Sequence, residues 1–148
     1  MKEKVISKSA QETINFAANF ASKLSSGIII ALDGDLGSGK TTFTKGLAKG
    51  LGIKEHITSP TFTIIQEYPF KNNRMRGIFY HIDLYRINSP EDAYSLGIDE
   101  ILNNPDGIKV IEWPDKLGYE NFPQNYIKIS FQSTMEDDIR EISIESNS

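Results

Sequence analysis

The segment that most constrains the fold of this chain runs from Gly34 to Thr41 and matches the pattern G-x-x-x-x-G-K-[ST]. Glycines at these positions let successive backbone N–H groups turn inward, and the N-terminus of a following helix adds partial positive charge that suits phosphate oxygens. The motif requires a buried strand before it and a helix after it. Both are predicted here, because Ile28–Leu32 is short, aliphatic and flanked by glycines, and a helix is expected from about Lys40 to Gly50.

The other expected elements alternate along the chain. A capping box at Ser9–Glu12 starts an amphipathic helix that continues to Leu24, and Ser89-Pro90 starts a helix that runs to about Leu96. Strands are expected at 5–7, 28–32, 62–68, 78–84, 108–111, 126–131 and 139–144. The third and fourth of these, joined by a polar loop at 69–77, should form an antiparallel pair, as should the last two.

These elements predict an α/β fold: a P-loop NTPase three-layer sandwich with a mixed, partly parallel central sheet and antiparallel additions. A length of 148 residues predicts a single domain, 1–148.

Charge and composition exclude several functions. Residues 134–148 carry the whole net charge of −4, so the rest of the chain is neutral and lacks the positive field with which nonspecific DNA or RNA binders hold their ligand. The absence of cysteine excludes disulfides, a thiol nucleophile and thiolate metal sites. No signal peptide or membrane span is evident, since the longest aliphatic run ends at Asp33, and a cytoplasmic protein is expected.

A phosphate site of this type predicts particular roles for its side chains. Lys40 should reach the β and γ phosphates, and the Thr41 hydroxyl should bind Mg²⁺. A carboxylate is also needed near the metal, and Asp83 and Glu112 each follow a predicted strand. Either acid is alternatively an ordinary solvated strand end. No Asn-Lys-x-Asp segment that reads guanine is present, which favours ATP.

Four segments together resemble the TsaE family, formerly called YjeE, which comprises small bacterial P-loop ATPases of tRNA threonylcarbamoyladenosine biosynthesis. The segments are Gly34–Phe43 (GDLGSGKTTF), Thr58–Phe62 (TSPTF), His81–Arg86 (HIDLYR) and Glu112–Pro114 (EWP), and the resemblance extends over residues 5–145.

The resemblance implies an ATPase that uses ATP and Mg²⁺ and works with two partner proteins, TsaB and TsaD. Together they place threonylcarbamoyl on the adenosine next to the anticodon of certain tRNAs. The transferase chemistry would belong to a partner, and tRNA would be met only indirectly through the complex. Hydrolysis by the isolated chain should be slow, because no evident arginine finger follows the segment 59–62, which would act as a switch loop.

The resemblance also implies roles for individual residues. Glu112 and Asp83, with Thr41, would hold magnesium, and Asp83 would orient the attacking water. Thr61 lies in a segment, 59–62, that would act as a switch loop beside the γ phosphate. Catalysis is thus expected from Lys40, Asp83 and Thr61. Contacts with the nucleotide are expected from Gly34, Asp35, Leu36, Gly37, Ser38, Gly39, Lys40, Thr41, Thr42, Gln11, Thr13, Trp113 and Arg140.

Other interpretations remain open for several residues. His81 is either catalytic or hydrogen-bonded within the structure, Trp113 covers either a ligand or the core, and Arg86 either stabilises transition-state charge or forms a salt bridge. The bases at 71–76 contact tRNA or an acidic partner, or are simply solvated. A small-molecule P-loop kinase, with 71–76 as its lid, is the alternative enzyme, and a nucleotide-dependent binding module is the alternative without catalysis.

Overall fold

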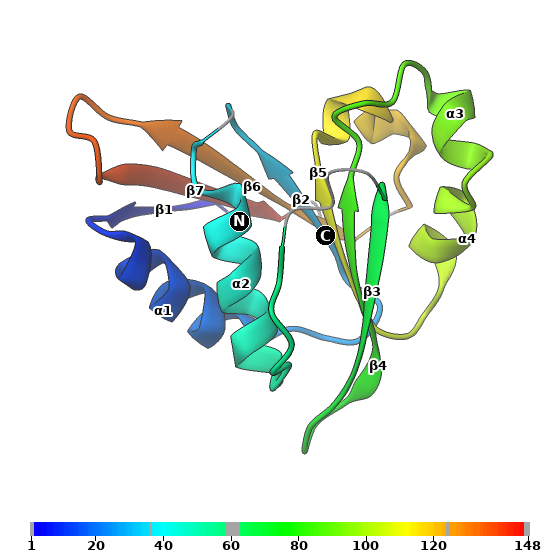
Figure 1. The fold of residues 1–148 in the computed structure, drawn as a ribbon, viewed down its shortest axis with the longest axis horizontal. Helices are drawn as coiled ribbons and strands as arrows, with labels where there is room; N and C mark the ends of the chain where they lie inside the picture. Colours follow the sequence, from blue (N-terminus) through cyan, green and yellow to red (C-terminus); the bar gives the residue numbers. More distant parts are fainter. Residues whose placement is uncertain (1, 36, 59–62, 124, 147–148) are drawn as a thin grey trace.

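The computed structural model describes residues 2–35, 37–58, 63–123 and 125–146, and its strands within those ranges form one seven-stranded sheet. The elements are β1 (Lys2–Ser7), α1 (Ala10–Ala21), β2 (Ile29–Asp33), α2 (Lys40–Leu51), β3 (Ile65–Lys71), β4 (Arg76–Asp83), α3 (Pro90–Tyr94), α4 (Ile98–Asn103), β5 (Ile108–Glu112), β6 (Tyr126–Ser133) and β7 (Arg140–Ser146), with 3₁₀ turns η1 (Pro114–Lys116) and η2 (Tyr119–Asn121). Figure 1 shows their arrangement.

The sheet has the order β1-β7-β6-β2-β5-β4-β3 and is mixed, as predicted. Its centre is parallel: β2 pairs with both β5 and β6, and β4 pairs with β5 in the same direction. The additions at both edges are antiparallel, with β3 on β4 at one side and β7 and then β1 on β6 at the other. The carboxyl ends of β2, β4 and β5 therefore lie at the same edge of the sheet.

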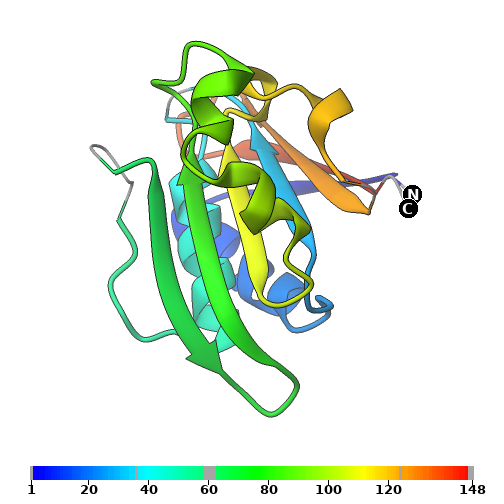
Figure 2. The same ribbon diagram turned by 90° about the vertical axis from the view of Figure 1, so that its right-hand side faces the viewer.

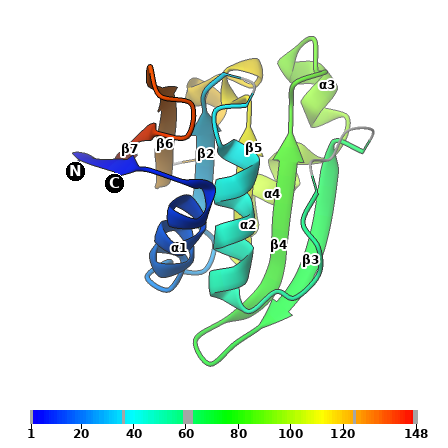
Figure 3. The ribbon, with the colours of Figure 1, turned by 60° about the vertical axis from the view of Figure 1, so that its left-hand side comes forward.

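Helices cover both faces of the sheet, which confirms the three-layer prediction. Helices α1 and α2 lie on one face, whereas α3 and α4 lie on the other (Figures 2 and 3). Alternate residues of β2 supply the two cores: Ile30 and Leu32 pack with the cluster under α1 and α2, and Ile29 packs with the cluster that includes Ile98 of α4. A strand buried on both faces explains the continuous aliphatic run in the sequence.

The hairpin of β3 and β4 is longer than predicted. The sequence predicts a loop at 69–77, but Pro69 pairs with Ile78 within the ladder, and the connection is confined to 72–75. Proline is tolerated because β3 is an edge strand, where one side of the backbone needs no hydrogen-bond donor.

The third predicted helix is also different, because the structure divides that region into two short helices. Helix α3 ends at Tyr94, and Gly97, in the left-handed conformation with φ 84°, begins α4. Ile98 and Leu102 of α4 are buried. Helix α4 has no recognisable signal in the sequence, since six residues with two buried apolar side chains give too little periodicity.

Helices α1 and α2 approach closely because α2 carries Gly46 and Gly50 at the contact. A Cβ atom added at Gly50 would lie 2.3 Å from the carbonyl oxygen of Ala18, and one added at Gly46 would lie 2.6 Å from that of Ile14. Any larger side chain would push the two helices apart. Among the described helices, none is long and apolar enough to cross a membrane.

We expect Gly50→Ala to destabilise the protein by about 1–3 kcal/mol, because an overpacked contact must displace backbone. Helix propensity alone predicts the reverse, a gain of about 1 kcal/mol. Urea unfolding of the variant and of the exposed control Lys45→Ala on the same helix measures the difference. A more stable Gly50→Ala protein would contradict the close contact.

Candidate functional site

A cleft of about 460 Å³ lies at the carboxyl ends of β2, β4 and β5, beside the N-terminus of α2. Its walls come from separate parts of the chain: the start of α1, the loop before α2, the ends of β4 and β5, and the start of β7. The lining residues are Ser9, Ala10, Thr13, Gly37, Gly39, Lys40, Thr41, Thr42, Ile64, Asp83, Tyr85, Arg86, Glu112, Trp113, Asp138 and Arg140.

The glycine-rich loop connects β2 to α2 as the motif requires. Gly39 precedes the helix with φ 111°, a left-handed conformation that side chains disfavour, and its carbonyl accepts the Phe43 N–H at 2.9 Å. The first N–H groups of α2 thus lie at the cleft, where a helix offers partial positive charge. Ser38, only 2% exposed, has a hydroxyl without a hydrogen-bond partner in the described structure. An anionic ligand at this loop would suit these donors.

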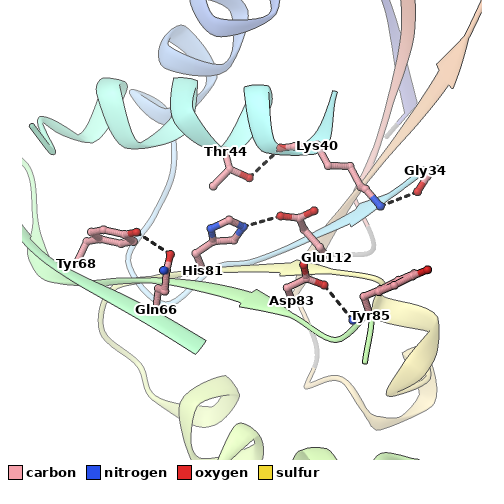
Figure 4. A network of polar contacts seen from close by, with 9 residues as sticks. All are labelled: Gly34, Lys40, Thr44, Gln66, Tyr68, His81, Asp83, Tyr85 and Glu112. Atoms are coloured by element: carbon pink, nitrogen blue, oxygen red, sulfur yellow. Dashed lines mark hydrogen bonds and ion pairs between the residues drawn. The ribbon is translucent and has the colours of Figure 1, made fainter. Parts of the chain in front are cut away.

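Lys40 is the first residue of α2, and its side chain turns back toward the loop (Figure 4). Its Nζ donates to the Gly34 carbonyl at 2.7 Å and lies 3.7 Å from the centroid of the Trp113 ring. Burial lowers the pKa of Lys40, while the nearby charges of Glu112 and Asp83 oppose that shift. Burial thus disfavours the charged form of Lys40, and the two neighbouring carboxylates offset this only in part.

Two carboxylates lie side by side because the parallel register pairs Asp83, the last residue of β4, with Glu112, the last residue of β5. The Asp83 carboxylate accepts the Tyr85 N–H at 2.9 Å. Burial is the main cause that raises the pKa of Asp83, and the charge of Glu112 adds to it, whereas the Tyr85 hydrogen bond lowers it. Negative charge is thus concentrated at the strand ends.

Glu112 forms a buried hydrogen bond with His81, the residue two positions before Asp83 on β4. Oε2 of Glu112 lies 2.5 Å from Nε2 of His81, and both side chains are almost completely buried (Figure 4). Of the two interpretations of His81, the structure therefore shows the hydrogen-bonded one. The contact fixes the orientation of the Glu112 carboxylate.

The donor groups of the cleft suit magnesium better than a metal held by protein alone. No group of three or more His, Cys, Asp or Glu within the described ranges could hold an ion by itself. Thr41, Asp83 and Glu112 instead offer one hydroxyl and two carboxylates to the same cleft. Magnesium is commonly held in this way, by one or two carboxylates together with water and substrate phosphates. These three residues fit such an ion.

The opposite wall is formed by the first turn of α1 and the start of β7. The hydroxyl of Thr13 lies 2.6 Å from that of Ser7, so its position is fixed by β1. Arg140 donates to the Gly37 carbonyl at 3.3 Å, and its buried Nε has no partner among the described residues. Gln11, in contrast, is exposed, does not line the cleft and donates to Asn15 at 2.9 Å.

Most of the predicted site residues come together in this cleft. Gly34, Asp35 and Ser38 belong to the loop without lining the cavity, and Leu36 and Thr61 lie outside the described residues. Five further residues line the cleft that are not predicted site residues: Ser9, Ala10, Ile64, Tyr85 and Asp138. Tyr85 lies within the HIDLYR segment and could have been found there, but no sequence signal brings Asp138 to the cleft.

Comparison with known proteins identifies a family for this chain. The family model "TsaE: Threonylcarbamoyl adenosine biosynthesis protein TsaE" matches residues 7–142. The chain belongs to the TsaE family. Members of this family take part in tRNA threonylcarbamoyladenosine biosynthesis, and the resemblance recognised in the sequence is thereby confirmed.

Relatives in the TsaE family match over most of their length. A protein of Treponema pallidum named tRNA threonylcarbamoyladenosine biosynthesis protein TsaE is 40% identical over 139 residues, which cover 94% of this chain and 97% of that protein. The protein of the same name from Borreliella burgdorferi is 50% identical over 107 residues, covering 72% and 74%. A crystal structure of YdiB from Bacillus subtilis superposes with a TM-score of 0.79 at 34% identity, covering all of this chain and 87% of that one.

The raised pKa of Asp83 predicts a pH-dependent effect of the substitution Asp83→Asn. The stabilising contribution of a carboxyl with a raised pKa is complete below the ordinary value of 3.8 and is lost as pH rises through the folded-state pKa. Since asparagine retains the acceptor for the Tyr85 N–H but cannot ionise, the variant should gain stability over wild type between acidic and neutral pH. Thermal unfolding without nucleotide or magnesium, across this range, measures the gain.

The exposed Glu120→Gln variant serves as the control for the loss of one negative charge. A stability difference between Asp83→Asn and wild type that stays constant from acidic to neutral pH would show that the Asp83 carboxylate is not destabilised by burial.

Proposed function

We propose that this chain binds ATP with Mg²⁺ and hydrolyses it as the ATPase component of tRNA threonylcarbamoyladenosine biosynthesis. It acts with TsaB and TsaD in the cytoplasm, and it meets tRNA through that complex. The transfer of threonylcarbamoyl to the adenosine next to the anticodon belongs to a partner, whereas ATP hydrolysis supports the cycle of the assembly.

One observation carries the proposal. The glycine-rich loop with Lys40 and two strand-end carboxylates, Asp83 and Glu112, line the same cleft. A phosphate-binding loop alone supports nucleotide binding, but hydrolysis also requires groups that hold a metal and orient water. The adjacent ends of parallel strands supply both carboxylates at the position where the loop supplies the cation.

Each group of residues has a proposed role that follows from its chemistry. Backbone N–H groups of the loop and the Lys40 ammonium neutralise phosphate charge, and Thr41, Glu112 and Asp83 hold magnesium. When bound, magnesium would supply positive charge to the phosphate oxygens. Asp83 orients the attacking water, with Thr61 as a further candidate.

Nucleotide contacts outside the loop are proposed for Thr13 and Arg140, which line the cleft. Trp113 also lines it, but its ring lies 3.7 Å from the Lys40 ammonium, so we propose that it acts on nucleotide through that lysine. Gln11, exposed and bonded to Asn15, is the weakest of the proposed contacts because it does not line the cavity. The neutral body of the chain supports indirect contact with tRNA.

The position of the basic hairpin argues against the kinase alternative. A lid must close over the phosphates, but the turn at 72–75 lies at the end of the sheet opposite the glycine-rich loop (Figures 1 and 3). Arg74 donates to the carbonyls of Ala21 and Leu24, so it caps the C-terminal end of α1. The segment 71–76 therefore does not supply the lid that a kinase would need.

Phosphate release and tRNA modification together test the proposed function. Wild type should release phosphate slowly alone and faster with TsaB and TsaD. Lys40→Ala should lower release by about 100-fold or more, the usual effect of removing a group that stabilises transition-state charge, and should abolish multiple-turnover tRNA modification. Lys45→Ala, exposed on the same helix, is the matched control. Unchanged modification by Lys40→Ala would refute the proposal.

Glu112→Gln tests the metal site separately. Because the amide has no charge to offer magnesium, the magnesium concentration that half-saturates ATP binding should rise by about 10-fold or more. Glu120→Gln, which removes an exposed carboxylate, should leave it unchanged. If Glu112→Gln titrates with magnesium like wild type, Glu112 is not a magnesium ligand.

A further inference from the structure

The ammonium group of Lys40 is already occupied in this structure. It donates to the Gly34 carbonyl at 2.7 Å, and the Trp113 ring covers it with a centroid distance of 3.7 Å. Lys40 as a whole is only 4% exposed. We call this arrangement of Lys40, Gly34 and Trp113 the resting contact. A lysine that must meet phosphate oxygens is thus held by other groups of the protein.

The backbone at Trp113 is in an unusual conformation. Trp113 has φ 58° and ψ 53°, the left-handed region, and it precedes Pro114. Among the described residues, the other non-glycine residue with positive φ is Asn125, and asparagine is a type that tolerates this region. A tryptophan does so only when its surroundings impose it, and such strained residues concentrate at ligand sites and switches.

The Trp113 ring lies between the core and the cleft. It is half-buried, packs against the core cluster that includes Ile98, lines the cleft and lies 5.0 Å from the Tyr85 ring, centroid to centroid. Tyr85 is itself 46% exposed. The two aromatic rings therefore lie at the cleft surface, and Trp113 lies directly after Glu112, one of the proposed metal ligands.

We propose that Trp113 is a positioning residue that holds Lys40 in the resting contact and releases it when nucleotide phosphate binds. This inference rests on the proposed nucleotide site. Because the resting contact must be broken when phosphate binds, the net free energy of phosphate binding is reduced. Trp113 thereby sets the affinity for the β phosphate and reports whether the site is filled.

Exchange of partners follows from the chemistry of the ammonium group. An aromatic ring attracts a cation through its quadrupole, which is weaker than the charge-assisted hydrogen bonds of a phosphate. The two cannot occupy the same side of the Lys40 ammonium. Phosphate should therefore displace the ring.

Intrinsic fluorescence tests the release, because Trp113 is the single tryptophan of the chain. Addition of ADP to the full-length protein should change the tryptophan emission, with a midpoint equal to the Kd measured by calorimetry. AMP has no β phosphate for Lys40, so it should leave the emission unchanged at concentrations where competition against ADP shows that it is bound. An emission that does not respond to bound ADP would overturn the proposal.

Substitution tests the energetic cost. Trp113→Leu should bind ADP about 2- to 30-fold more tightly than wild type, the range that corresponds to losing one cation–π contact. Trp113→Phe, which keeps a weaker aromatic face, should fall between them and guards against misfolding of the leucine variant. Tyr94→Leu, at an exposed aromatic of α3, is the matched control. Calorimetry measures all four proteins.

The outcomes separate this proposal from the proposed function. Tighter ADP binding by Trp113→Leu supports the resting contact, whereas equal or weaker binding overturns it and shows that the ring does not compete with phosphate. If wild type binds neither ADP nor ATP, the nucleotide site itself is refuted.

Discussion

Parallel pairing at the centre of the sheet is the constraint on which the site depends. Because β2, β5 and β4 run in the same direction, the glycine-rich loop, Glu112 and Asp83 all follow strand ends at one edge. Antiparallel pairing would have placed these groups at opposite edges. Parallel strands in turn require helices on both faces, which α1 and α2 supply on one side and α3 and α4 on the other.

The same edge concentrates charges that water hydrates poorly. Burial lowers the pKa of Lys40 and raises that of Asp83, so each group is disfavoured in its charged form although the other lies close by. Two contacts within the folded protein partly replace the lost hydration: His81 forms a hydrogen bond with Glu112, and the Trp113 ring lies against the Lys40 ammonium. A ligand that carries both an anion and a cation would stabilise the charged forms of Lys40 and Asp83 together.

The sequence was sufficient to predict the glycine-rich loop, the mixed sheet and the strand-end carboxylates, because each depends on local pattern and strand direction. It was insufficient for features that depend on where an element lies in the folded protein. Local pattern places Pro69 in a loop, because nothing local indicates that β3 is an edge strand. The contact of Gly50 with Ala18 joins two helices and has no signature in either.

The candidate site shows the same division. Lys40 and Thr41 followed from the motif itself, and Arg140 was reached only through the family resemblance. The contact between the Tyr85 and Trp113 rings depends on how two loops pack, and periodicity does not describe loops. Asp138 lines the cleft from the connection between β6 and β7, where the sequence offers no chemical pattern to recognise.

The two walls of the cleft are held by different parts of the sheet. Asp83 and Glu112 end the central strands β4 and β5, and Lys40 follows the central strand β2, whereas Thr13 is held through Ser7 of the edge strand β1 and Arg140 begins β7, which pairs with β1. Edge strands open more readily than central ones in the native state, so backbone amides of β1 should exchange with solvent faster than those of β5. A molecule that touched both walls would couple the stability of β1 to that of the central strands, so filling the cleft would slow exchange at an edge strand three positions along the sheet from β2.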